Sequence, residues 1–154
     1  MPNWCEGTLK IRGKSEDVKR FVYLGLEQVQ DKNGLSLPVE HDDSYYIVYR
    51  MLYIKNTKRG FVYDTCISVK DDIDDKEVST LAFDVRFAWD CKIEQILAIC
   101  KEFDIDVRMH LFEQGGLFTR EIEIIDKAVK KDITKEYKDY DEYKWECIMP
   151  NLGG

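Results

Sequence analysis

The hydrophobic and polar positions near the N-terminus alternate from residue 5 to residue 12. One side of this segment carries the small or apolar residues Cys5, Gly7, Leu9 and Ile11. An alternation with a period of two predicts a half-buried β-strand whose polar side faces away from the core. The strand places Cys5 in the buried layer, where a free thiol packs as a small hydrophobe. Trp4 has the opposite parity, and we expect it at the end of the polar face.

A period of three to four residues follows directly. Its apolar positions fit one buried stripe of a helix that runs to about residue 30: Val18, Phe21, Val22 and Val29. Ser15 precedes this stripe, and its hydroxyl is a suitable N-cap for the first turn. The sequence DKNG at residues 31–34 ends the predicted helix.

Two apolar segments, residues 45–54 and 60–69, are separated by the polar sequence KNTKR. Segments of this length around a short polar connection predict a β-hairpin. A clear alternation comes after it, in residues 79–89. One face of this segment carries large apolar residues: Leu81, Phe83, Val85, Phe87 and Trp89. The pattern predicts another half-buried strand.

The second half of the chain begins with a predicted helix for which Asp90 is the N-cap. The buried stripe of this helix is Ile93, Ile96, Leu97, Cys100 and Phe103. Residues 106–112 and 117–124 then form two predicted strands, and EQGG between them predicts a turn.

The tail, from about residue 126 to residue 154, places Tyr137, Tyr140 and Lys144 on one stripe of a predicted helix. Without the hairpin, the order of elements is strand, helix, strand, helix, strand, strand. This order predicts an α+β fold of the ferredoxin-like type, a split βαβ sandwich whose helices cover one face of the sheet. The hairpin is then an insertion at about residues 42–78, and residues 1–154 form a single domain with a C-terminal helical tail.

The composition is that of a soluble globular protein. Apolar residues make up 44% of the 154 residues, and charged residues make up 34%. No apolar segment approaches the ~20 residues of a membrane span, and the N-terminus lacks the pattern of a signal peptide. Five cysteines at wide, irregular spacings predict reduced thiols and no zinc site. We therefore expect a cytoplasmic protein without a metal or another cofactor.

The net charge of −7 bears on the class of partner. Nucleic acids are bound by concentrated basic surfaces, so we expect no direct nucleic-acid binding. Acidic residues gather in DDIDDKE at residues 71–77 and in KDYDEYKWE at residues 138–146. Such runs are typical of solvated surface. The alternative is that they mimic nucleic acid toward a basic partner.

The motif NWC at residues 3–5, followed by a strand that ends in glycine, resembles the YubB-type ferredoxin-like family of plasmid and phage proteins. The second half is similar to the same family, with a strand ending in FAW, a helix, and a strand leading to FEQGGLF. The matching positions are Trp89, Glu113, Gly115 or Gly116, and Phe118. The resemblance implies the ferredoxin-like fold and an origin in a phage or another mobile element, and it implies no catalytic residue.

The polar face of the predicted sheet is the main candidate for chemistry. A pocket there would use His110 as a base, Arg86 or Arg108 to hold an anion, and Trp4 to stack on a ligand. The sequence contains no glycine-rich phosphate loop, HExxH motif or nucleophile elbow. Because the histidine has no evident nucleophile or orienting partner, charged pairs across neighbouring strands are the simpler interpretation.

Two hypotheses about function follow. The first is a non-enzymatic accessory protein of a phage or another mobile element, which binds a host protein or complex in the bacterial cytoplasm and inhibits a bacterial defence complex. Its partner-binding residues would lie in the acidic loop, the hairpin and the tail: Asp71, Asp72, Asp74, Asp75, Tyr45, Tyr137 and Tyr140.

The second hypothesis is a small-ligand or nucleotide-binding module, with or without enzymatic activity, that uses Trp4, Arg86, Arg108 and His110. A ligand site predicts that His110 and the two arginines surround one concavity. A protein-binding role predicts that the charges of this face are paired or covered and that the hairpin or the tail is exposed.

Overall fold

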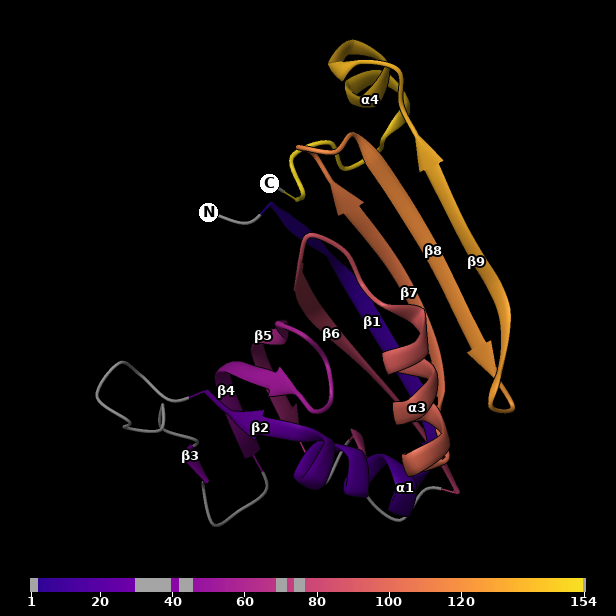
Figure 1. The fold of residues 1–154 in the computed structure, drawn as a ribbon. Coiled ribbons are helices and arrows are strands. Elements are labelled where there is room, and N and C mark those ends of the chain that lie inside the picture. The colour runs from indigo at the N-terminus through magenta and orange to yellow at the C-terminus, as the bar shows by residue number, and fades with distance from the viewer. Residues whose placement is uncertain (1–2, 30–39, 42–45, 69–71, 74–76, 154) are drawn as a thin grey trace.

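The computed structural model of the chain describes residues 3–29, 40–41, 46–68, 72–73 and 77–153. In residues 40–41, 46–50 and 64–68 the description covers the backbone alone. Within the described residues the protein is built on one antiparallel sheet of nine strands, with helices on one face of it and a further helix beyond one end (Figure 1). The prediction of an α+β fold is confirmed at this level.

The strands are β1 (Trp4–Lys14), β2 (Leu26–Gln28), β3 (Glu40–His41), β4 (Tyr46–Ile54), β5 (Gly60–Ser68), β6 (Val78–Ala88), β7 (Asp106–Glu113), β8 (Phe118–Ile125) and β9 (Ala128–Glu136). Their order is β2-β4-β5-β6-β1-β7-β8-β9, and β3 pairs with β4. β1 is antiparallel to both β6 and β7, so these two strands run parallel to each other. Helix α3 (Ile93–Phe103) connects them, which makes β6-α3-β7 a split βαβ unit around β1.

The hydrophobic core lies between the sheet and the two helices α1 (Ser15–Arg20) and α3 (Figure 1). The alternation in β1 and β6 places one side of each strand in this core: Cys5, Leu9, Ile11, Leu81, Phe83, Val85 and Phe87. Phe21 and Phe103 pack edge to face with their ring centroids 5.6 Å apart. The predicted burial of Cys5 is confirmed, since its side chain is fully enclosed.

The predicted hairpin is present as β4 and β5, which pair antiparallel on either side of residues 55–59. β5 also pairs with β6, where Val62 lies opposite Val85. β2 pairs with the other side of β4, where Leu26 lies opposite Ile54. The hairpin therefore extends the sheet sideways beyond β6. Ile73, which follows it in the insertion, is buried in the core.

The first helix is shorter than predicted. α1 ends at Arg20, a π-helical turn η1 (Phe21–Gly25) follows, and β2 begins directly after it, so no helix reaches residue 30. The Gly25 carbonyl accepts a hydrogen bond from the Lys55 N–H at 2.9 Å. Pairing with β4 thus overrides the helical pattern of this segment. Ser15 is not the N-cap but the first helical residue, and its hydroxyl is hydrogen-bonded to that of Ser79 at 2.8 Å.

The end of β6 also differs from the prediction. Trp89 has a φ of +72°, a left-handed conformation that interrupts the strand alternation, and its side chain is 60% exposed instead of buried. The backbone N–H of Trp89 donates a hydrogen bond to the Asn3 carbonyl at 2.8 Å. Asp90 does not cap α3, because Lys92 occupies the cap position and the Asp90 carboxylate binds Arg120 instead.

The tail begins as a strand, so the prediction of a purely helical tail is wrong. Asp126 and Lys127 have φ values of +50° and +59°, and two left-handed residues in succession make a tight turn that returns the chain along β8 as β9. Helix α4 is confined to Tyr140–Glu146. Because β9 is the last strand of the sheet and almost all of its side chains are exposed, no apolar alternation marks it in the sequence.

Candidate functional site

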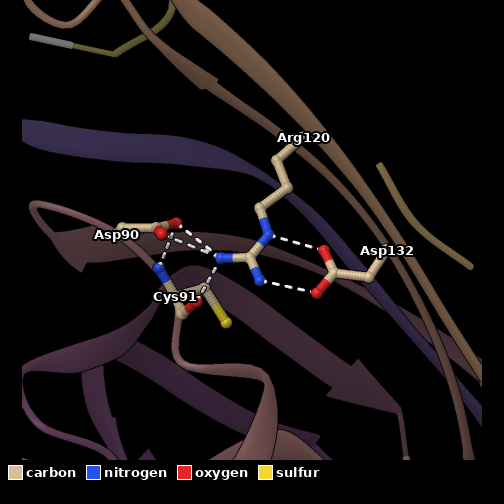
Figure 2. A network of polar contacts seen from close by, with 4 residues as sticks. All are labelled: Asp90, Cys91, Arg120 and Asp132. Carbon is tan, nitrogen blue, oxygen red and sulfur yellow. Dashed lines mark hydrogen bonds and ion pairs between the residues drawn. The ribbon is translucent and has the colours of Figure 1, made fainter. Parts of the chain in front are cut away.

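A charged network lies where β6 leads into α3, and Figure 2 shows it. Arg120 of β8 donates through Nε and Nη2 to the two carboxylate oxygens of Asp132 at 2.8 and 2.9 Å. Its Nη1 donates to Oδ2 of Asp90 at 2.8 Å and to the Cys91 carbonyl at 2.5 Å. Asp90 in turn accepts a hydrogen bond from the Cys91 N–H at 2.6 Å. One guanidinium thus joins the loop before α3 to both β8 and β9.

This network is suited to hold the structure together. The hydrogen bonds to Asp132, followed by those to Asp90, raise the pKa of Arg120, so the guanidinium stays charged. The thiols of Cys5 and Cys91 lie nearby, and burial raises the pKa of both. A thiol that remains protonated is a weak nucleophile. The network therefore offers ionic pairing and no activated nucleophile.

Arg120 is not among the predicted site residues, although the sequence contains a signal for it. It has the same parity in β8 as Phe118 and Ile122, so the alternation places it on the face that the helices cover. A charge in a buried layer is stable only with paired partners. Its parity alone therefore predicts an ion pair at this position.

The positions that carry the family resemblance lie close together at the same end of the sheet. The buried carboxylate of Glu113 accepts hydrogen bonds from the N–H of Gly115, at 2.9 Å, and from that of Gly116. The Asn3 carbonyl binds the N–H of Trp89, and a Cβ atom on Gly115 would collide with the Asn3 side chain. These contacts give the residues a structural role, since they connect the N-terminus, the end of β6 and the β7–β8 turn.

Both arginines of the predicted ligand site are already paired. Arg86 forms an ion pair with Glu6, and Arg108 forms one with Glu123 at 2.9 Å. The guanidinium of Arg86 also lies over the ring of Trp4, 5.6 Å from its centroid. An anionic ligand would have to compete with these carboxylates for both cations.

His110 lines three of the hollows on the polar face of the sheet. One, of about 290 Å³, also includes Arg108. A second, of about 510 Å³, also includes Arg86. The third, of about 460 Å³, includes neither arginine. The imidazole itself stacks on Phe112, with ring centroids 4.7 Å apart. Arg86 and Arg108 therefore line different hollows, and these two hollows do not bring them around one concavity.

Part of the predicted partner-binding set lies outside the described residues: Tyr45, Asp71, Asp74 and Asp75. Asp72 is described and is exposed. Tyr137 is buried against Tyr143, with ring centroids 5.2 Å apart, so its ring serves packing. Tyr140 is exposed at the start of α4.

Exposed apolar side chains gather around the end of α4. Trp145 is 88% exposed, Ile148 is 96% exposed and Met149 is 52% exposed. Ile133 of β9 is also exposed, and it lines a hollow of about 460 Å³ together with Ile148 and Met149. Trp145 does not line this hollow, but it lies three residues before Ile148 in the chain. We call these four residues, Ile133, Trp145, Ile148 and Met149, the C-terminal apolar surface.

The segment that carries this surface is anchored to the sheet. Tyr143 is fully buried in a second cluster with Phe112, Tyr137 and Cys147. Its hydroxyl donates to the Leu152 carbonyl at 3.2 Å, and burial raises its pKa. Helix α4, which carries Trp145, is therefore anchored by a buried side chain, and it lies beyond the ends of β7 and β8 (Figure 1).

Tyr137, Tyr140 and Lys144 do not form one helical stripe, because Tyr137 directly follows β9 and α4 begins only at Tyr140. Tyr143 and Cys147, four residues apart, are the buried pair, and Lys144 is exposed. Trp145 lies two residues from Tyr143, which places it on nearly the opposite side of the helix. A stripe through Tyr143 and Cys147 would have identified Trp145 as an exposed side chain from the sequence.

No family model, curated protein or solved structure matches the chain. In the part that the structure describes, no group of three His, Cys, Asp or Glu side chains is placed to hold a metal ion. Nor does any helix there have the length and apolar character needed to cross a membrane. The fold and the surface define an α+β protein that presents an anchored apolar surface, and its function is argued from that surface.

Proposed function

We propose that this chain acts by binding another protein through the C-terminal apolar surface. The observation that carries the proposal is the exposure of Trp145 and Ile148, which are 88% and 96% accessible on a segment that is itself anchored. Apolar side chains exposed as a group mark interaction sites. Tryptophan is enriched among the residues that contribute most to binding free energy.

The anchoring of the segment adds to the argument. An interface that is already ordered loses less conformational entropy on binding than a flexible one. Tyr143 and Cys147 are buried, one two residues before Trp145 and the other directly before Ile148, so the exposed side chains adjoin an anchored backbone. The anchored segment is therefore better suited to bind another protein than a tail without such an anchor would be.

The polar face of the sheet also supports a protein-binding function more than it supports small-ligand binding. The ion pairs Glu6–Arg86 and Arg108–Glu123 occupy the cations that would hold an anionic substrate. Paired arginines on this face and an exposed tail are the arrangement expected of a protein-binding role. The alternative of a small-ligand or nucleotide-binding module has less support from these contacts.

The biological setting of the proposal rests on the sequence resemblance alone. It is that of a ferredoxin-like accessory protein of a phage or another mobile element, which works in the bacterial cytoplasm and inhibits a host defence complex. The split βαβ unit β6-α3-β7 around β1 is compatible with a ferredoxin-like core, to which the hairpin and β9 add strands.

The test compares two substitutions that remove the same atoms from different surfaces. Ile148→Ala changes the C-terminal apolar surface, whereas Leu24→Ala changes an exposed leucine on η1, below the opposite end of the sheet (Figure 1). Proteins captured from a bacterial host lysate by the wild-type chain are identified, and the affinity of the main partner is then measured by calorimetry. We expect Ile148→Ala to weaken the affinity for this partner by about tenfold or more, and Leu24→Ala to leave that affinity unchanged. Trp145→Ala, a second change in the C-terminal apolar surface, should weaken it by a similar factor. Equal affinity for all variants would refute the proposal.

A further inference from the structure

A hollow on the polar face lies directly beside the C-terminal apolar surface. It has a volume of about 510 Å³, and Met149 lines it, so the hollow and the apolar surface share a residue. Its floor comes from β1, β5, β6 and β7, and its wall comes from the C-terminal segment through Met149 and Leu152. This volume is in the range of cavities that bind small organic groups.

The hollow contains an unpaired carboxylate. Glu6 is engaged by Arg86, and it also accepts a hydrogen bond from the Gly153 N–H at 3.3 Å. Asp84 is exposed at the centre of β6 and has neither an ion pair nor a hydrogen bond to its side chain within the described part of the chain. The charges that line the hollow are thus two carboxylates and one guanidinium, which leaves an excess of one negative charge.

Aromatic rings line the same hollow as the Asp84 carboxylate. Tyr63, His110 and Phe112 line the same hollow. The Arg86 guanidinium lies 4.5 Å from the centroid of the Tyr63 ring and pairs with Glu6 at the same time. The protein's own arginine therefore demonstrates the combination of contacts that this surface offers to a guanidinium: a π face and a carboxylate.

We infer that the hollow receives an arginine side chain of the partner protein. This inference rests on the proposed protein-binding function. The guanidinium would donate to both oxygens of Asp84, and its methylene stem would pack against Met149 and Leu152. Arginine fits better than lysine because a planar group can bind a carboxylate in its plane and an aromatic ring on its face.

Charge complementarity favours this occupant over a nucleotide or single-stranded nucleic acid. The same rings could stack on bases. A phosphate backbone, however, would meet the unpaired Asp84 on a chain whose net charge is −7. Because Met149 belongs to both surfaces, one segment of a partner can cover the C-terminal apolar surface and place an arginine in the hollow.

The experiment uses N-acetyl-arginine amide as the probe and follows the backbone amide shifts of the full chain by NMR. We expect saturable shifts around Thr8, Tyr63, Asp84 and Met149, with a Kd of the order of 1 mM. N-acetyl-citrulline amide, which is the neutral analogue, should produce shifts that do not saturate. Asp84→Asn should abolish saturation, whereas Glu94→Gln, an equal charge change on the other side of the sheet, should not.

Each other result counts against the inference. Equal binding of the arginine and citrulline probes, or arginine binding that survives Asp84→Asn, would overturn it. Saturable shifts at the same rings with oligothymidine, but not with the arginine probe, would assign the hollow to nucleic acid. The proposed function fails separately: if Trp145→Ala and Ile148→Ala leave partner affinity unchanged, the apolar surface is not the docking site, whatever the arginine probe does.

Discussion

Arg120 of β8 and Asp132 of β9 are diagonal neighbours that form a two-pronged ion pair, with both carboxylate oxygens accepting from one guanidinium at 2.8 and 2.9 Å. The third nitrogen of Arg120 binds Asp90 and the Cys91 carbonyl on the loop before α3. The pair therefore connects the edge strand β9 to the core of the fold.

Replacement of Arg120 by methionine should destabilise the protein. The change leaves Asp90 and Asp132 without their shared cation and the Cys91 carbonyl without its donor. We expect the free energy of unfolding, measured with urea, to fall by about 2 kcal/mol. Arg12→Met is the control, because it removes an exposed ion pair to Asp106 and should change stability little. Equal effects of the two substitutions would contradict the structural role of Arg120.

The buried thiols should be unreactive in the folded protein. Burial raises the pKa of Cys5 and Cys91, and it raises that of Cys100 to about 12. At pH 8 we expect iodoacetamide to leave these three cysteines unmodified and to modify them rapidly in urea, as mapped by mass spectrometry. Rapid labelling of native Cys5 or Cys91 would indicate an activated thiol and reopen a catalytic role for the network around Arg120.

Gly7 should be intolerant of a side chain. A Cβ atom there would overlap the backbone carbonyl of His110 on β7, which cannot move without breaking the pairing of β1 with β7. We expect Gly7→Ala to lower the free energy of unfolding by about 1–3 kcal/mol. At Gly115 the obstacle is the Asn3 side chain, which can rotate away. Thermal unfolding should therefore show a much smaller loss for Gly115→Ala, and the reverse order would refute this account.

The cap of α4 should depend on pH. The Asp139 side chain accepts from the Glu142 N–H at 2.9 Å, and this bond lowers the pKa of Asp139. A depressed carboxyl pKa stabilises the folded helix at pH values above the ordinary carboxyl pKa of about 4, and this contribution is lost as the pH falls through the lowered value. Asp139→Ala should thus speed amide exchange in residues 142–147 at about pH 6.

The matched variant for this test is Asp139→Asn, which keeps a capping oxygen and should preserve most of the protection. Near pH 3 the difference between Asp139→Ala and the wild-type protein should shrink, because the wild-type carboxyl is then increasingly protonated. A difference that is the same at both pH values would show that the charge of Asp139 does not act on α4.

The sequence by itself determined the buried halves of the central strands. In β1 and β6 the period of two is set by the backbone, so Leu9, Ile11, Phe83 and Val85 had to share the layer that the helices cover. The hairpin β4–β5 followed from two apolar segments on either side of a short polar connection. α3 followed from its apolar stripe. These patterns arise within each element, where neighbouring residues alone decide which side is apolar.

Only the tertiary structure decided the features that depend on distant partners. β9 exists because the turn at Asp126 and Lys127 returns it to β8, although its own side chains remain in water. Arg120 is stable in a buried layer because Asp90, thirty residues away, reaches it. Which of the possible stripes of the tail is buried was decided when Tyr143 packed against Phe112 and Tyr137, and this choice leaves Trp145 exposed. In each case the deciding free energy comes from contacts between remote segments, which no local periodicity encodes.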